Sequence, residues 1–214
     1  MGNKSHFFRR SSGGGVLSLV AEYNFNNNLI DEIGGNNGTG TDITYDVGSF
    51  GNEAVFNGST SEVRTPNSTV WDISNGVNDT HIRIEVLVKF NSVSGQQFIL
   101  AKSPKNGFGW EVISVNSKIY ITIYDSVNFA QQLQIGCDIQ TDENGYSNIL
   151  VDYDGQGLSS GLDVSVNGIS SGIVDGTTNY TSAYLLNTDT TFGRADRRYD
   201  RRLDGAISQI KIYK

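Results

Sequence analysis

The most distinctive group of reactive side chains is the arginine-rich stretch Arg194–Asp204, which holds five Arg and three Asp in eleven positions. Guanidinium groups pair with carboxylates in a fork geometry, and a tyrosine ring offers a stacking surface. Arg194, Arg197, Arg198 and Tyr199 are therefore candidate contacts for an acidic glycan or protein. The alternative is a solvated hairpin in which Asp neutralises Arg. The sequence favours this alternative because opposite charges stay adjacent.

A second group lies in residues 1–15, which read MGNKSHFFRRSSGGG. Aromatic and arginine side chains dominate the energetics of protein interfaces, so Phe7, Phe8, Arg9 and Arg10 are candidate partner-binding residues. A Gly/Ser spacer, which is typical of flexible linkers, follows them. The sequence predicts an N-terminal attachment arm over residues 1–15 that binds a larger protein assembly. The alternative is an ordinary disordered terminus.

Few side chains are arranged for catalysis. The two histidines, His6 and His81, fall in the arm and at the start of a predicted strand, so they form no pair for a zinc site or a triad. The glycines of the arm lack the Lys-Ser/Thr that follows them in a phosphate-binding loop. We therefore predict that the chain is not an enzyme.

Composition and charge limit the partners. Residues 16–193 contain six basic and twenty acidic residues, and such an acidic body repels nucleic acid and anionic membranes. Neither nucleic acid nor an anionic membrane is therefore an expected partner.

Cys137 is the single cysteine, so an internal disulfide is excluded. The apolar run Val16–Ala21 is interrupted by Ser18, which is unlike a secretory signal.

The elements that must position these residues are β-strands. Residues 82–90 alternate Ile, Ile, Val, Val and Phe with polar or larger side chains, the period of a strand with one buried face. No segment has the 3.6-residue period of a capped helix. The expected fold is all-β, one antiparallel two-sheet sandwich over residues 16–214. Similar strands are predicted at 16–25, 97–102, 110–115, 118–124, 133–139, 148–153, 162–166 and 207–213.

Five segments, in order, support a family assignment. They are AEYNFNNNLIDEIGGNNGT (21–39), GSFGNEAVFNGS (48–59), the strand 82–90, ILVDYDG with LDVSVNG (149–155 and 162–168), and LDGAISQIKIY (203–213). Together they resemble the laminin-G-like branch of the concanavalin A-like lectin/glucanase superfamily. The resemblance implies a jelly-roll sandwich whose first strand, near 20–25, lies beside its last, near 207–213.

The resemblance also implies a calcium site at the rim of the sandwich. Asp31, Asn36 and Asn37 supply oxygen ligands of the type that Ca²⁺ accepts. The acidic pair common in the family's closing strand is replaced here by Ser208 and Gln209. The alternative is that residues 31–38 form an ordinary polar turn, and no cofactor other than Ca²⁺ is indicated.

Related glucanases place a Glu-x-Asp-x(x)-Glu pattern on one strand, and no Glu in this chain is followed two residues later by Asp. The resemblance therefore indicates binding without hydrolysis. Trp71, Trp110 and Tyr184 are candidate sugar-stacking residues, although core packing is the usual role of such aromatics.

The arm and the fold together suggest a noncatalytic, lectin-like module on the surface of a phage virion. It would be a decoration or adhesion protein of the head or tail, present in several copies and able to bind a glycan. The alternative is a secreted or cell-surface carbohydrate-binding module, located outside the cell. A glycoside hydrolase with an unrecognised site is the third hypothesis.

Overall fold

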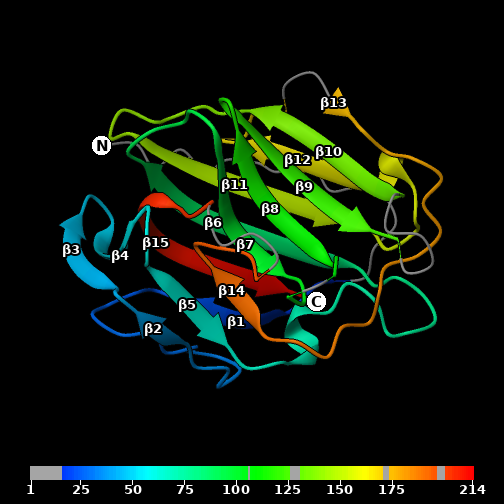
Figure 1. The fold of residues 1–214 in the computed structure, drawn as a ribbon, viewed down its shortest axis with the longest axis horizontal. Helices are drawn as coiled ribbons and strands as arrows, with labels where there is room; N and C mark the ends of the chain where they lie inside the picture. Colours follow the sequence, from blue (N-terminus) through cyan, green and yellow to red (C-terminus); the bar gives the residue numbers. More distant parts are fainter. Residues whose placement is uncertain (1–15, 106, 126–130, 171–173, 197–200) are drawn as a thin grey trace.

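The computed structural model describes residues 16–105, 107–125, 131–170, 174–196 and 201–214. Two antiparallel sheets pack face to face, and the described residues contain two short 3-10 helices but no α-helix (Figure 1). The predicted all-β two-sheet sandwich, a concanavalin A-like jelly roll, is confirmed. The proposed arm, with Phe7, Phe8, Arg9 and Arg10, lies outside the described residues.

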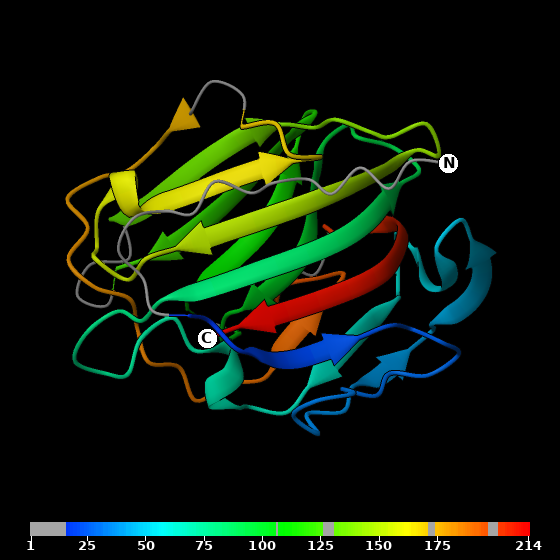
Figure 2. The ribbon, with the colours of Figure 1, turned by 180° about the vertical axis from the view of Figure 1, so that it is seen from behind.

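One sheet has seven strands and forms the layer seen in Figure 2. Its order is β12-β11-β6-β15-β4-β3, and β1 also pairs with β15. The strands are β1 Leu19–Tyr23, β3 Thr44–Gly48, β4 Gly51–Asn57, β6 Ile82–Phe90, β11 Tyr146–Tyr153, β12 Leu162–Val166 and β15 Asp204–Tyr213.

The other sheet has eight strands in the order β13-β10-β9-β8-β7-β14-β5-β2 and faces the viewer in Figure 1. Its strands are β2 Thr39–Thr41, β5 Glu62–Thr65, β7 Gln96–Lys102, β8 Trp110–Val115, β9 Lys118–Tyr124, β10 Gln132–Asp138, β13 Val174–Asp175 and β14 Thr190–Phe192. The 3-10 helices are η1, Thr69–Trp71, and η2, Ser159–Gly161.

The first and last strands lie side by side, as the sequence predicts. Ala21 pairs with Ile212 and Tyr23 with Ile210, while Gly205–Ile207 of β15 pair with β4 instead. The backbones of Ser18 and Lys214 exchange two hydrogen bonds, of 2.6 and 2.9 Å. The described chain therefore begins and ends at the same place.

Tight turns set the register of the hairpins. Asn116 and Ser117 join β8 to β9, and Asn167 and Gly168 follow β12, all with positive φ. Positive φ at both central residues is the geometry of a type I′ turn, whose twist matches that of paired strands. Asn-Gly, the pair at 167–168, is the sequence that such a turn favours.

Aromatic rings fill one part of the core between the sheets. Trp71 lies against Tyr23, Trp110 and Phe192 at centroid distances of 6.1, 6.5 and 5.5 Å. Trp71 and Trp110 are buried, and the Trp110 indole N–H donates to the Trp71 carbonyl oxygen at 2.8 Å. Both tryptophans therefore belong to the core and not to a sugar-stacking surface.

Within the described residues, no helix is long and apolar enough to cross a membrane.

Candidate binding surface

The outer face of the eight-stranded sheet combines aromatic and polar side chains. On β9, Ile119, Ile121 and Ile123 are buried in the core. Successive side chains of a strand point to opposite faces, so Tyr120, Thr122 and Tyr124 point outward. Gln132 and Gln134 on β10 point the same way because Leu133 and Ile135 are core residues.

The strand register aligns several of these side chains in one row. Gln134 of β10 pairs with Thr122 of β9, and Thr122 pairs with Glu111 of β8. The row continues through Ala101 of β7 and Thr191 of β14. The row thus runs from the partly exposed Gln134 into buried positions, Thr122, Glu111, Ala101 and Thr191.

Hydrogen bonds fix the polar members of the row. The Gln134 amide donates to Thr122 Oγ1 at 2.8 Å, and the Tyr124 hydroxyl donates to Glu111 Oε1 at 3.1 Å. Thr122 and Glu111 are buried, whereas Gln134, Tyr120 and Tyr124 are partly exposed. We call Tyr120, Tyr124 and Gln134, with Thr122 and Glu111 beneath them, the tyrosine face.

Two contacts hold the tyrosine rings in place. Gly136 pairs with Tyr120, and a Cβ on Gly136 would lie 2.6 Å from the Tyr120 ring. The missing side chain therefore leaves room for that ring against β10. The Tyr124 ring packs against Phe108 at a centroid distance of 4.7 Å. These contacts restrict both rings before any ligand arrives, and preorganisation of this kind lowers the entropy cost of binding.

The segment after β14 covers the adjoining part of this face. Phe98, Ala101, Ile113 and Ala195 form a separate apolar cluster there, with Tyr120 packed against it. The Phe98 N–H donates to the Arg201 carbonyl oxygen at 3.3 Å, so Ala195 and Arg201 both lie close to β7. The tyrosine face thus borders the arginine-rich stretch.

Arg194 is buried in an ion-pair network instead of projecting toward solvent. It pairs with Glu62 and, at 2.5 Å, with Asp196. Asp196 also accepts two hydrogen bonds from Arg64, at 2.7 and 2.9 Å. This geometry supports the structural interpretation of Arg194, in which Asp neutralises Arg. Arg197, Arg198 and Tyr199 lie outside the described residues, and their proposed role as ligand contacts stays a prediction.

Glu62 binds both ends of this stretch. Its Oε2 pairs with Arg194 and, at 3.4 Å, with Arg202. Arg202 also donates to the carbonyl oxygens of Thr60 and Ser61 at 2.9 and 3.2 Å. The Glu62 carboxylate on β5, the strand next to the edge strand β2, therefore binds both Arg194 and Arg202, near the start and the end of the arginine-rich stretch.

Asp31, Asn36 and Asn37 lie together in one loop, but they bind one another. Asp31 accepts from the Glu22 and Ile33 N–H groups, and from both the backbone and the side-chain amide of Asn36, at 2.9–3.1 Å. Asn37 Oδ1 accepts from the Asp31 N–H at 3.0 Å. These contacts give the three residues a role in shaping the loop. Calcium binding there stays a prediction.

Hydrogen bonding stabilises the ionised form of Asp31. Burial raises the pKa of its carboxyl group, but hydrogen bonds from Glu22, Asn36 and Gly34 outweigh burial and hold the pKa below its ordinary value. In the described part of the chain, no three His, Cys, Asp or Glu side chains are grouped so that they could hold a metal ion.

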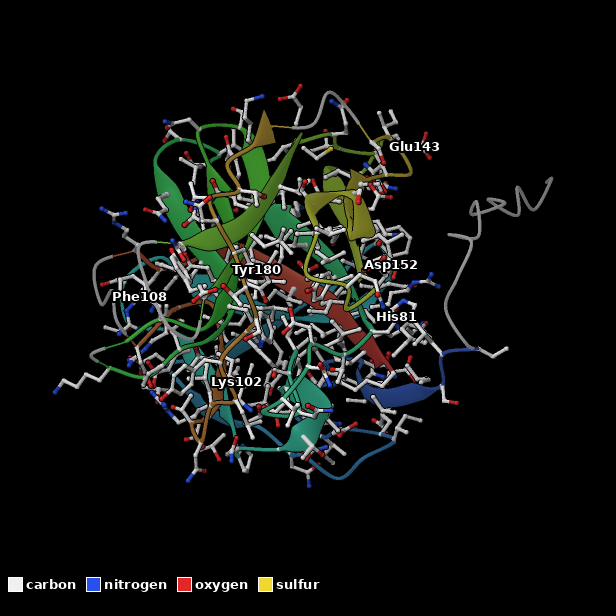
Figure 3. All side chains as sticks on the ribbon, turned by 90° about the vertical axis from the view of Figure 1, so that its right-hand side faces the viewer. His81, Lys102, Phe108, Glu143, Asp152 and Tyr180 are labelled. Carbon is white, nitrogen blue, oxygen red and sulfur yellow. The ribbon has the colours of Figure 1, made fainter. Side chains whose placement is uncertain are left out.

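Two carboxylates anchor the loops at the end of the sandwich that faces the viewer in Figure 3. Asp79 accepts from the hydroxyls of Tyr153 and Tyr180 and, at 2.7 Å, from the Ala183 N–H. Asp125 accepts from the Thr181 N–H at 2.6 Å. At the same end of the sandwich, His81 Nε2 lies 2.8 Å from Asp152 Oδ1.

The carboxylates that point outward on β8–β10 are too far apart for hydrolysis of a glycosidic bond. Asp138 lies four residues along β10 from Gln134, about 13 Å, and Gln134 is two strands from Glu111. Glycoside hydrolases hold their two carboxyl groups about 5–10 Å apart. These two described carboxylates therefore do not form the closely spaced pair of a glycoside hydrolase.

Comparison with known proteins relates the chain to bacterial toxin domains by structure alone. No protein-family model and no curated protein sequence matches it. The receptor-binding domain of botulinum neurotoxin C/D mosaic serotype superposes with a TM-score of 0.66 at 16% identity, covering 92% of this chain and 48% of that one. The likeness establishes the fold.

Two further toxin structures agree. The binding domain of serotype G matches with a TM-score of 0.63 at 17% identity, over 91% of this chain and 47% of that chain. The binding domain of neurotoxin DC, solved in complex with rat synaptotagmin II, has a TM-score of 0.64 at 14% identity and coverages of 92% and 48%. The chain thus spans about half the length of the domains it resembles.

Tyr120 and Tyr124 were missed as sugar-stacking candidates. The signal was available, because KIYITIY (118–124) alternates Ile with Tyr or Thr and so assigns both tyrosines to the face opposite the isoleucines. Tyr184, which was a candidate, is nearly half exposed but lies in the rim loop after β13.

Proposed function

We propose that the chain is a noncatalytic, lectin-like binding module that binds a neutral glycan at the tyrosine face. The observation that carries the proposal is the pair of partly exposed tyrosine rings held over a hydrogen-bonded polar row. Sugar rings present an apolar face that stacks on aromatics and hydroxyl groups that need hydrogen-bond partners. The acidic body disfavours sialylated, sulfated or uronic-acid glycans.

The fold likeness supports a binding role. The similar solved structures are receptor-binding domains of neurotoxins, and one is in complex with a protein receptor. The separation of the outward carboxylates on β8–β10 supports binding over hydrolysis.

A glycan array identifies the ligand, and calorimetry then tests the site. We expect Tyr124→Ala to weaken binding about tenfold, since aromatic contacts contribute about 0.5–1.5 kcal/mol beyond area burial. Tyr120→Ala weakens binding similarly, and Tyr124→Phe, which keeps the ring, weakens it less. A reducing-sugar assay on the same ligand should show no product.

Tyr184→Ala is the matched control because Tyr184 is partly exposed but lies on the rim. Unchanged binding by Tyr120→Ala and Tyr124→Ala, with loss by Tyr184→Ala, would assign the ligand to the rim and refute the tyrosine face.

The location follows from the arm and is also proposed. Residues 1–15 attach this module to a larger assembly, and a phage virion surface is the setting that combines a basic aromatic arm with an adhesion-type sandwich. The alternative is an extracellular carbohydrate-binding module.

A further inference from the structure

Exposed apolar side chains gather on three loops at the end of the sandwich seen in Figure 3. Val77 is 80% exposed, Leu158 61%, Tyr184 47% and Leu185 45%. We call these four residues the rim patch. They belong to loops 74–80, 154–161 and 176–189, and the third loop also contacts Gln134 of the tyrosine face through Thr177.

Contacts join the three loops that carry the rim patch. A Cβ on Gly76 would lie 3.2 Å from Leu185 Cδ2, so Leu185 packs beside the loop that carries Val77. A Cβ on Gly157, next to Leu158, would lie 3.6 Å from the Thr181 carbonyl oxygen. Asp79 joins the first and third loops through Tyr180 and Ala183.

The rim patch has an acidic border. The three loops contain Asp79, Asp154 and Asp189 and no Lys or Arg, so they carry net negative charge, although Asp79 accepts hydrogen bonds from Tyr153, Tyr180 and Ala183 and Asp189 lies 3.7 Å from Arg64. The neighbouring lysine side chains, Lys102 and Lys214, already have partners: Lys102 pairs with the Asp72 carboxylate at 2.6 Å, and Lys214 donates to the Asp72 carbonyl oxygen. A segment that combines aromatic and basic side chains would complement this surface in both polarity and charge.

Such a segment exists in the same chain, and the described structure begins beside the rim. Ser18 pairs with Lys214, which bonds to Asp72, two residues before loop 74–80. The roughly ten residues from Phe8 to Ser18 reach as far as about 33 Å. Residues 4–10 carry Lys4, Phe7, Phe8, Arg9 and Arg10 and no acid.

We propose that residues 4–10 dock on the rim patch of their own chain. Phe7 and Phe8 pack on Val77 and Leu185, while the basic residues face the acidic border. A tether of about ten residues gives an effective concentration near the millimolar range, so even weak contacts hold the segment in place. The arm then covers the rim patch until an assembly partner competes for it.

Limited trypsin digestion of the full chain tests this inference, because cleavage after Arg9 and Arg10 reports whether the segment is docked. Cleavage of this kind follows the population of the open form. We expect Val77→Asp, Leu185→Asn and Phe7→Ala/Phe8→Ala each to speed cleavage by about tenfold, the factor for a segment that is docked nine-tenths of the time. High salt should speed cleavage of the unaltered chain.

Val47→Asp is the matched control, since Val47 is also 80% exposed but lies on β3. Its cleavage rate should equal that of the unaltered chain at every protein concentration. Equal rates for all variants would overturn the proposal. Protection that grows with concentration, together with a dimer in sedimentation velocity, would assign the docking to a second copy and overturn it as well. Melting curves confirm that each variant is folded.

Discussion

Single polar residues in this chain act mainly by organising loops. Asp31 binds several partners within its own loop and the preceding strand, whereas Asp79 and Glu62 bind partners from segments that are distant in sequence. Buried carboxylates need such partners, because an unsatisfied charge in the interior is costly. The result is that residues with the chemistry of ligand sites are used to shape the surfaces between them.

Asp31→Asn tests this role at one position. The neutral amide loses charge-assisted hydrogen bonds, so we expect the free energy of unfolding at pH 7 to fall by about 1–3 kcal/mol. The lowered pKa of Asp31 means that its contribution is present above the ordinary pKa near 4 and is lost as pH falls through the folded-state value. The variant should therefore lose less stability between neutral and acidic pH.

Urea unfolding at several pH values measures both effects. Asp46→Asn is the control, because Asp46 is exposed and, among the described residues, its side chain accepts a hydrogen bond from the neighbouring Val47 N–H. Equal stability of the two variants at neutral pH would contradict the role assigned to Asp31.

At the scale of strands, two glycines allow close approach for different reasons. A Cβ on Gly205 of β15 would lie 2.1 Å from the Lys89 carbonyl oxygen, part of the backbone of β6. A Cβ on Gly136 would meet the Tyr120 ring, which can move outward. Backbone in the centre of a sheet cannot shift in this way, so the two positions should respond differently to added volume.

We expect Gly205→Ala to destabilise the protein by about 3 kcal/mol or more and Gly136→Ala by about 1 kcal/mol. Gly136→Ala should also weaken glycan binding, because it displaces Tyr120. Thermal unfolding and calorimetry measure these outcomes. A Gly136→Ala variant that binds glycan normally would show that the Tyr120 ring position is unimportant.

Strands with strong alternation could be predicted from sequence, and their ends shift by only a few residues. The short strands β2, β5 and β14 could not, because segments such as Thr39–Thr41 have no apolar period of their own and form only against a neighbour. The geometry of the tyrosine face likewise depends on neighbouring strands. The outward direction of Tyr120 was readable, but its position over Gly136 depends on cross-strand register, which no local pattern specifies.

At the scale of the whole molecule, the proposed binding face and the proposed attachment arm lie in different regions. The tyrosine face lies on the outer side of the eight-stranded sheet, while Ser18, and hence the arm that precedes it, starts at the edge strand of the other sheet. A module arranged in this way can be held by its terminus while its sheet face meets a ligand.

Deletion of residues 2–12 separates these roles. The deletion removes no described strand, so we expect an unchanged melting temperature and unchanged glycan affinity but loss of incorporation into the parent particle. Quantitative mass spectrometry of purified particles measures incorporation. Normal incorporation of the shortened chain would refute attachment through the arm.

The two ion pairs that Glu62 makes, with Arg194 and with Arg202, have a consequence for which changes of sequence the fold accepts. Because Arg194 and Arg202 pair with one carboxylate, the two ends of the stretch are joined at the sandwich, and Ala195 and Asp196 are held there by the apolar cluster and by Arg64. An insertion between Asp196 and Arg201 therefore adds little loop-closure entropy, because its ends are already joined. This position, and not the anchored residues on either side of it, is the one at which a foreign peptide can be grafted with the least cost to the sandwich.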